Sequence, residues 1–298
     1  MESTSLKKMK KSETLKAYLF LLPALTLLLV FTFYPIFFGT ALSFFHYNVV
    51  TSPHFVGLKN FKEILKDPKA KLALENSLIY LLIVPLLQLS SIILAVLVNQ
   101  DLKGIRFFRA CFYIPVITSI VVVALAWKWI LAGNGLLNGL LLSLHLITHK
   151  IHWLTNPHIA LYSVMLVTFW KGVGYYMVLY LAGLQTLDPQ YEEAAKIDGA
   201  GPVKIFTKIT LPLLKPMIAF CTIISSIAAL KVFAEVYVMT GGGPLFSSTT
   251  MVYEIYDQFM KRLNLGYASA LGVVLSLVIG LLSYVNYRFF KRGGFEAD

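Results

Sequence analysis

The amino-acid sequence predicts an all-α integral membrane protein with about six transmembrane helices. Of its 298 residues, 57% are hydrophobic and 14% are charged, and the mean hydropathy is +0.72, which lies outside the usual range of soluble globular domains. At least six apolar segments reach the roughly 20 residues that a helix needs to cross a bilayer. We expect these spans at 18–45, 77–98, 110–132, 159–183, 212–236 and 265–290.

The spans form a single membrane domain, 18–290, between short tails at 1–17 and 291–298. The first span follows a lysine-rich tail, but its apolar stretch is too long for a signal peptide, so we expect it to remain attached. Four prolines inside the spans predict bent helices whose freed carbonyl groups are satisfied by neighbouring elements. These prolines are Pro23, Pro35, Pro85 and Pro115.

The distribution of basic residues predicts that both termini face the cytoplasm. Cytoplasmic loops of membrane proteins retain Lys and Arg, so the net charge of +11 argues for membrane insertion rather than for nucleic-acid binding. With the N-terminus inside, the cytoplasmic segments hold fifteen basic residues and the external segments hold eight. Five of these eight lie in the first external loop, so the later loops decide the orientation.

Two external loops are predicted to contain short amphipathic helices. In the first loop, Phe61, Ile64, Leu65 and Leu72 recur at helical spacing between lysines, which suits a helix lying at the membrane surface. In the second loop, a glycine-rich turn precedes an amphipathic segment near 249–263.

A polar insert, LDPQYEEAAKIDGAGPVKIFTKITLPLLKP, separates the fourth and fifth spans at 187–216. Asp188 is a suitable N-cap, Pro189 suits the first helical position, and the acidic pair that follows lies where the helix dipole favours negative charge. A short helix is therefore expected to run to about Asp198. Gly199 supplies the backbone freedom that a helix end requires, and the next glycine-proline pair begins a second short helix. A capped connector and a docking segment for a partner both fit this pattern.

Within this insert, EAAKIDG at 193–199 is followed after nine residues by I-x-L-P at 209–212. This pattern resembles the signature loop of permease subunits of binding-protein-dependent ABC importers, and it is specific because residue types and two separate spacings agree. Other segments resemble the carbohydrate-uptake branch of that family, among them FVGLKNF, YLAGLQTLDPQYEEAAKIDGAG and GYASALGVV. The first of these is similar to the maltose-type and glycerol-phosphate-type first permeases, although the large external insertion of some such subunits is missing.

The resemblance implies a type I ABC importer permease fold that crosses the bacterial cytoplasmic membrane several times. It implies that the loop at about 187–211 forms a coupling helix seated in a cleft of a cytoplasmic ATPase. The residues carried over to this role are Glu192, Glu193, Ala194, Ala195, Asp198, Gly199, Ala200, Ile209, Leu211 and Pro212.

The same resemblance implies the partners of the chain. They are a second homologous permease, two copies of the ATPase, an external solute-binding protein, a sugar or oligosaccharide substrate and the lipid bilayer, with no nucleic acid. The chain has no GxxxxGK[ST] loop to hold a phosphate. We therefore expect no catalytic residue and no cofactor on this chain, and ATP with Mg²⁺ on the separate ATPase.

Two rival classes of protein would need other residues. A metal-dependent membrane enzyme would have to use His145, His149 and His152, which could share a helix face, but no HExxH motif or nearby carboxylate completes such a site, so no metal is expected. An ion-coupled secondary transporter is the alternative, because such proteins use intramembrane charges. The charges in question are Lys171, Lys231 and Glu235.

Residues expected along the substrate path combine aromatic faces with hydrogen-bonding groups, since sugars present apolar C–H faces and polar edges. They are Gln88, Trp170, Lys171, Tyr175, Ser226, Phe233 and Glu235. Lys171 lies about midway along the fourth span, where an ammonium costs at least roughly 2.5–3.5 kcal/mol, so it must face a wet cavity or a partner. The alternative is a structural lysine that donates to backbone carbonyl groups of a bent neighbouring helix.

Overall fold

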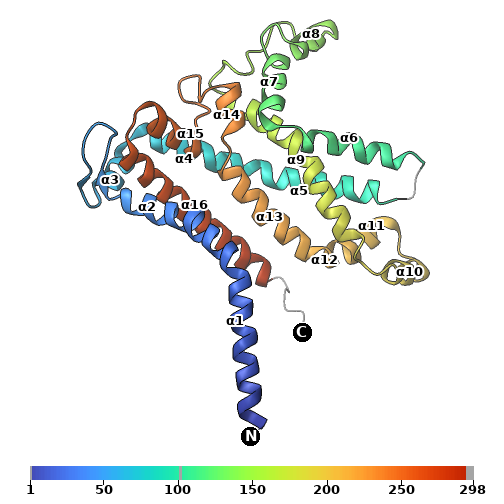
Figure 1. Cartoon of the computed structure of the whole chain (residues 1–298). Helices are drawn as coiled ribbons and strands as arrows, with labels where there is room; N and C mark the ends of the chain where they lie inside the picture. Colours follow the sequence, from blue (N-terminus) through green and yellow to red (C-terminus); the bar gives the residue numbers. More distant parts are fainter. Residues whose placement is uncertain (1, 101–102, 293–298) are drawn as a thin grey trace.

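The computed structural model describes residues 2–100 and 103–292, most of which are helical (Figure 1). In chain order the helices are α1 (Glu2–Leu28), α2 (Tyr34–Leu42), α3 (Lys59–Lys66), α4 (Pro68–Ile79), α5 (Ile83–Val98), α6 (Ile105–Ile117), α7 (Ile120–Ile130), α8 (Leu136–Ser143), α9 (Ala160–Leu184), α10 (Gln190–Ile197), α11 (Pro202–Ile205), α12 (Leu211–Leu213), α13 (Lys215–Leu230), α14 (Ala234–Met239), α15 (Met251–Tyr256) and α16 (Leu265–Arg292). Short π-helical segments adjoin some of these helices, namely η1 (Leu29–Phe33), η3 (Phe206–Thr210) and η4 (Asp257–Lys261). A 3-10 turn, η2 (Tyr80–Leu82), joins α4 to α5. A short antiparallel pair joins β1 (Phe45–His46) to β2 (His54–Phe55).

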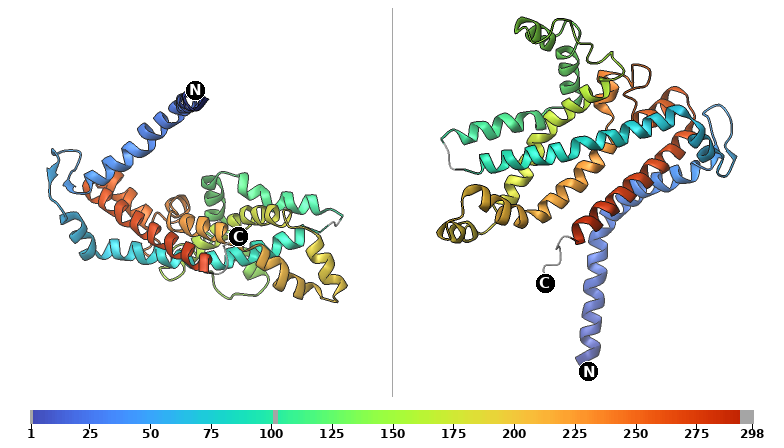
Figure 2. Two further views of the ribbon diagram at one scale, coloured as in Figure 1. Left: turned by 90° about the horizontal axis from the view of Figure 1, so that it is seen from below. Right: turned by 180° about the vertical axis from the view of Figure 1, so that it is seen from behind.

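Within the described residues, five stretches are long and apolar enough to cross a membrane, or six if one bent pair is counted as a span. The spans pack in a row, with α6 against α9, α9 against α5, α5 against α13, α13 against α16, and α16 against α2 (Figures 1 and 2). Successive spans reverse direction, so the start of α1, the segment α10–α12 and the end of α16 share one side. The β1–β2 pair, α8 and α15 lie on the other side.

The first span, Lys16–Leu42, lies at the edge of the row, and its most apolar window has no residue buried inside the chain. The wide turn η1 precedes Pro35. A proline ring crowds the carbonyl group four residues earlier, here that of Phe31, and a wider turn at this point relieves the clash. The exposed apolar surface of this span requires lipid or another protein around it.

The second span begins earlier than the sequence predicts, because the first external loop forms two helices rather than one surface helix. Asp67 ends α3 and caps α4, its side chain accepting a hydrogen bond from the Lys69 backbone at 2.8 Å, and Pro68 occupies the first turn of α4. The helix then continues through η2 into α5, so the span runs over Pro68–Val98 instead of 77–98.

The prediction of one continuous span at 110–132 is wrong. Helix α6 ends at Ile117, α7 begins at Ile120, and their axes differ by 99°. Pro115 lies in the last turn of α6, and Thr118 and Ser119 have extended ψ angles of 139° and 132°. Together these residues prevent the helix from continuing. Hydropathy does not reveal this break, because the apolar run extends through both helices.

The fifth span, Lys215–Met239, is also discontinuous. Helix α13 ends at Leu230, and α14 begins at Ala234 after a non-helical link. Phe233 in this link has φ −141° and ψ −56°, outside the helical region. A span interrupted near the membrane interior exposes backbone polar groups, which lipid cannot satisfy.

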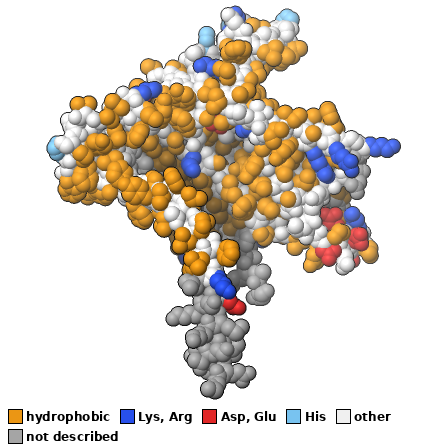
Figure 3. All heavy atoms as spheres, in the orientation of Figure 1, with side chains coloured by type: hydrophobic (Ala, Val, Ile, Leu, Met, Phe, Trp, Pro, Cys, Tyr) orange, Lys and Arg blue, Asp and Glu red, His pale blue; other side chains and the backbone are white. Residues whose placement is uncertain are grey.

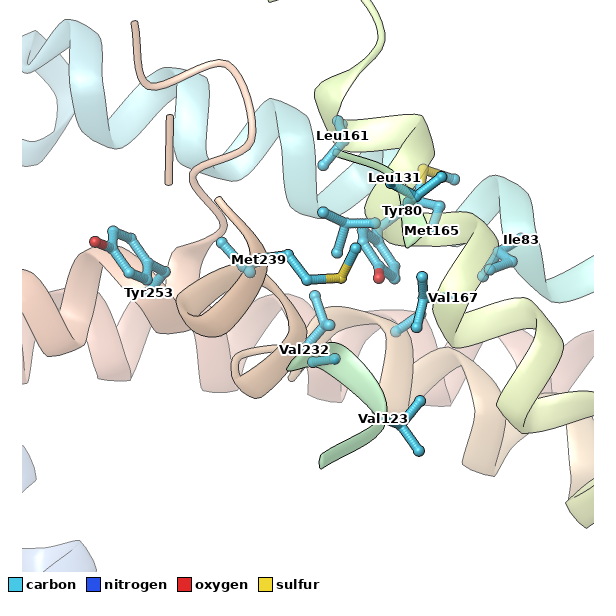
Figure 4. Packing of buried hydrophobic residues seen from close by; sticks show 14 of the residues in the cluster. Tyr80, Ile83, Val123, Leu131, Leu161, Met165, Val167, Val232, Met239 and Tyr253 are labelled. Atoms are coloured by element: carbon cyan, nitrogen blue, oxygen red, sulfur yellow. The ribbon is translucent and has the colours of Figure 1, made fainter. Parts of the chain in front are cut away.

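A central core holds both broken spans in place. Tyr80 is fully buried at its centre and lies beside Met239 of α14, with Val232 of the α13–α14 link and Val123 of α7 close by (Figure 4). Val167 adds a contact from α9. The core therefore joins the ends of the broken helices to the continuous spans.

A second set of contacts fixes the loop between α14 and α16. Lys69 Nζ lies 2.8 Å from Glu254 Oε2 and 2.8 Å from Asp257 Oδ2, and the Glu254 side chain is 0% exposed. Asn76 donates to the Thr249 carbonyl group at 2.9 Å. Burial acts to raise the pKa of Asp257, but the hydrogen bonds and charges of Lys69 and Lys261 outweigh it and hold that pKa below its usual range.

We predict that Lys69→Met destabilises the protein by roughly 3–5 kcal/mol, because it leaves the Glu254 carboxylate buried without its partner. Thermal unfolding of the purified protein in detergent measures the change. The double variant Lys69→Met/Glu254→Gln removes both charges and should recover most of the loss. Equal destabilisation by the single and double variants would contradict the ion-pair explanation.

Candidate functional site

The segment between α9 and α13 folds as a capped helix, a sharp turn and a second short helix, as predicted from its residues. Asp188 Oδ1 accepts a hydrogen bond from the Gln190 backbone N–H at 2.9 Å. Glu192 and Glu193 lie in the first turn of α10. Gly199 then has a φ of +74° and ends the helix, a conformation that residues with a Cβ rarely adopt.

Most of the predicted coupling residues face away from the chain. Glu192, Glu193, Ala194, Asp198, Gly199 and Pro212 are exposed, Ala200, Ile209 and Leu211 are half-buried, and Ala195 is buried. Ala195 therefore packs inside the hairpin in this structure. Two apolar residues at the tip of the hairpin, Ile197 and Val203, were not among the predicted residues, and they are 87% and 74% exposed. Charged side chains gather over α10 at this end of the molecule (Figure 3).

Lys171 of α9 fills the break between α6 and α7. Its ammonium donates to the carbonyl groups of Pro115 at 2.8 Å, Val116 at 3.1 Å and Thr118 at 2.6 Å. These carbonyl groups are the ones that lose helical partners when α6 ends. These contacts match the alternative given for Lys171 in the sequence analysis, namely a structural lysine that donates to carbonyl groups of a bent neighbouring helix.

Gln88 of α5 is buried and joins three spans. Its Nε2 donates to the Cys221 carbonyl group at 3.2 Å and to Ser225 Oγ at 2.7 Å, and its Oε1 accepts a hydrogen bond from the Tyr180 hydroxyl. With these partners the amide has little remaining capacity for a substrate. Gln88 therefore stabilises helix packing in this conformation.

Glu235 lies in the first turn of α14, directly after the break in the fifth span. Thr168 of α9 donates to Glu235 Oε1 at 3.3 Å, and the hydroxyl groups of Thr168 and Tyr80 are 2.5 Å apart. Tyr80 supplies the hydrogen of that shorter bond when Thr168 donates to the carboxylate. A chain of hydroxyl groups from the core thus orients Glu235.

Phe233 belongs to an aromatic cluster that the sequence analysis did not identify. Its ring centroid lies 5.4 Å from that of Tyr237, 6.4 Å from Tyr253 and 5.1 Å from Tyr256. Lys261 borders the cluster, with Nζ 5.3 Å from the Tyr253 ring centroid. Hydrogen bonds to Tyr253 and to Asp257 raise the pKa of Lys261 to about 12. The sequence did contain a signal for this cluster, because Tyr253 and Tyr256 are three residues apart and therefore lie on one face of α15.

The remaining predicted path residues do not converge on this cluster. Trp170 pairs edge-on with Trp127 at 5.5 Å between ring centroids. Tyr175 packs edge-on against the neighbouring Tyr176. Ser226 is buried and donates to the Thr222 carbonyl group at 2.7 Å. Aromatic and polar groups therefore occur at several depths rather than at one site.

The three histidines were expected to share a helix face. They lie instead on the loop that follows α8. Helix α8 ends at Ser143, and His145 has a φ of +55°, which directs the chain away from the helix axis. His145, His149 and His152 are all exposed. Within residues 2–100 and 103–292, no group of three His, Cys, Asp or Glu side chains could hold a metal ion.

The face shown in Figure 3 is hollowed between α16 and α13. Hydrophobic side chains form most of its walls, and a few charged side chains lie near its upper edge. Helix α13, which runs beside this hollow, leads through a short non-helical link into α14. A groove beside a discontinuous helix is typical of a transport path.

The arrangement of broken spans, an open groove and an exposed helical hairpin defines a membrane transport permease. The sequence model of the family described as "Binding-protein-dependent transport system inner membrane component" matches residues 73–293. The chain belongs to this family, whose members are multi-pass membrane proteins.

Full-length relatives carry the same assignment. The chain is 37% identical to the probable ABC transporter permease protein YurN of Bacillus subtilis over 93% of this chain and 96% of that protein. It is 33% identical to the lactose transport system permease protein LacF of Rhizobium radiobacter over 96% and 98% of the two chains. It is 32% identical to the sn-glycerol-3-phosphate transport system permease protein UgpA of Yersinia pestis over 92% and 94%.

A solved structure shares the fold. A chain of a bacterial ABC transporter involved in the import of the acidic polysaccharide alginate superposes with a TM-score of 0.82 at 25% identity, over 97% of this chain and 99% of that one. The protein is therefore an ABC importer permease with the type I fold, and the predicted family and fold class are confirmed. The ion-coupled alternative is set aside, because the family match covers most of the membrane domain.

We predict that Lys171→Met lowers the stability of the protein by about 3 kcal/mol, because three part-buried carbonyl groups lose a charged donor. Thermal unfolding in detergent measures this loss. Lys128→Met is the matched control, since Lys128 is exposed and donates to a single carbonyl group, that of Val238. Wild-type stability combined with abolished transport would contradict the structural role and favour a lysine on the substrate path.

Proposed function

We propose that this chain carries a sugar or oligosaccharide across the bacterial cytoplasmic membrane as one of two related permeases. An external solute-binding protein delivers the substrate, and two copies of an ATPase hydrolyse ATP with Mg²⁺. Relatives named for lactose, for multiple sugars and for sn-glycerol 3-phosphate support the substrate class, as does the fold shared with the alginate importer. The broken fifth span and the aromatic cluster line the substrate path.

The exposed hairpin α10–α11 carries this proposal. The hairpin has acidic side chains at the start of α10. Its tip has Ile197 and Val203, two apolar residues that nothing in the described part of the chain covers. An apolar tip on an otherwise polar hairpin suits insertion into a partner's cleft. With the termini in the cytoplasm, as the basic residues predict, this hairpin faces the cytoplasmic ATPase.

Gly199→Glu is predicted to uncouple ATP hydrolysis from transport. No atom lies within 4 Å of a Cβ added at Gly199, so the substitution disturbs the positive-φ turn and the partner surface rather than internal packing. Uptake into proteoliposomes should fall at least about tenfold while ATP hydrolysis persists. Gly199→Asn is the control, because Asn tolerates this conformation; normal uptake with Gly199→Glu would favour a simple connector.

Cysteine cross-linking tests which residues face the ATPase. Cysteines at Ile197 and Ala200 are predicted to cross-link to the ATPase in the assembled importer, because these residues are exposed or half-buried at the hairpin tip. Ala195→Cys serves as the control, since Ala195 is buried inside the hairpin. Cross-linking at Ala195 alone would show that the hairpin docks in another way.

Affinity purification tests the proposed assembly. The tagged chain should be recovered with a second, non-identical permease and two ATPase copies, and uptake should require the external binding protein. Native mass spectrometry gives the stoichiometry. An active transporter that contains this polypeptide as its sole subunit would overturn the proposal.

A further inference from the structure

We propose that the substrate of this permease carries a negative charge and that Lys231 binds it. This inference rests on the proposed function, in which the broken fifth span lines the substrate path. It adds the charge of the substrate, which none of the preceding observations specifies.

Lys231 occupies the first position after α13, at the break in the fifth span, and its side chain is exposed. Its backbone N–H donates to the carbonyl groups of Ile227 and Ala228, both at 3.1 Å, which fixes the residue at the helix end. Among the described residues, no carboxylate lies within 4.0 Å of its ammonium. An ammonium inside a span requires water, backbone carbonyl groups or an anionic partner, and no hydrogen bond from the Lys231 ammonium to a carbonyl group occurs among the described residues.

The other lysines around α14 already have partners. Lys171 donates to three carbonyl groups at the α6–α7 break, and Lys128 donates to the Val238 carbonyl group. Lys261 pairs with Asp257 at 3.1 Å. Lys231 is thus the cation at this break whose charge is left for a ligand.

The acidic groups near α14 do not neutralise this region. Glu235 accepts a hydrogen bond from Thr168, and Asp257 is shared among Lys69, Lys261 and Arg262. With Glu254, which pairs with Lys69, three carboxylates stand against six basic side chains, namely Lys69, Lys128, Lys171, Lys231, Lys261 and Arg262. Phe233, two residues after Lys231, begins the aromatic cluster, so a sugar ring stacked there places a carboxylate or phosphate near the free ammonium.

A cysteine reporter measures the charge along the path in the assembled importer. Ala228 is exposed and lies one turn before Lys231 on the same face of α13. Ala228→Cys, in a background with Cys111→Ser, is treated with methanethiosulfonates that carry either a sulfonate or a trimethylammonium group. Lys231→Gln should lower the anionic-to-cationic rate ratio about fivefold to tenfold, Lys231→Arg should preserve it, and Lys71→Gln is the distant control.

Two results overturn the inference in different ways. An unreactive thiol in the Ala228→Cys variant shows that Lys231 faces no aqueous path, which also contradicts the placement of the path in the proposed function. A reactive thiol with an unchanged rate ratio leaves the path in place but shows that Lys231 pairs with an acid of another subunit.

Ligand protection and uptake distinguish the sources of the negative charge. An oligouronide and sn-glycerol 3-phosphate are the anionic probes, and lactose is the neutral probe. One anionic probe should protect the thiol of the Ala228→Cys variant and compete for uptake. Lys231→Gln should raise about tenfold the concentration of that probe that gives half-maximal protection. Protection by lactose that is insensitive to Lys231→Gln would overturn the proposal.

Discussion

The bilayer requires every backbone polar group to find a partner within the protein, and the fold depends on how Lys171 meets this requirement. Its ammonium satisfies three carbonyl groups where α6 ends. The chain can therefore turn by 99° inside an apolar segment. Gly174, one turn further along α9, permits the close approach, since a Cβ there would lie 2.0 Å from the Phe112 carbonyl oxygen.

The turn after α6 directs α7 against α14, and this contact positions the second broken span. Tyr80 and Met239 fill the space between these helices. On the side of the molecule opposite the hairpin α10–α11, Lys69 binds Glu254 and Asp257 and fixes the loop that returns from α14 to α16. Irregular backbone at one break is thus supported by side chains from continuous helices, which keeps the groove beside α14 ordered.

The sequence predicted those features that depend on local chemistry. The cap at Asp188, the turn at Gly199 and the spans at 159–183 and 265–290 follow from short-range rules, and the structure contains all of them. The break after α6 was not predictable from hydropathy, because it depends on Lys171, which lies more than fifty residues away. Residues chosen by type, such as Gln88 and Ser226, bind other helices or their own backbone in this structure, and their place on the substrate path stays a prediction, since polar side chains in spans have packing roles as well as functional ones.

The exposed hairpin α10–α11 and the groove are connected by one uninterrupted helix. Helix α13 begins at Lys215, soon after α10–α12, and ends at Leu230, where the break with Lys231 starts. Its sixteen residues span about 24 Å at the usual rise per residue. In the proposed function, a displacement of the hairpin moves α13 as a rigid element and alters the break at its far end, where the aromatic cluster begins. The break supplies the local freedom that a continuous helix lacks, so the position of Phe233 and Glu235 relative to α13 can change while the rest of the row stays packed.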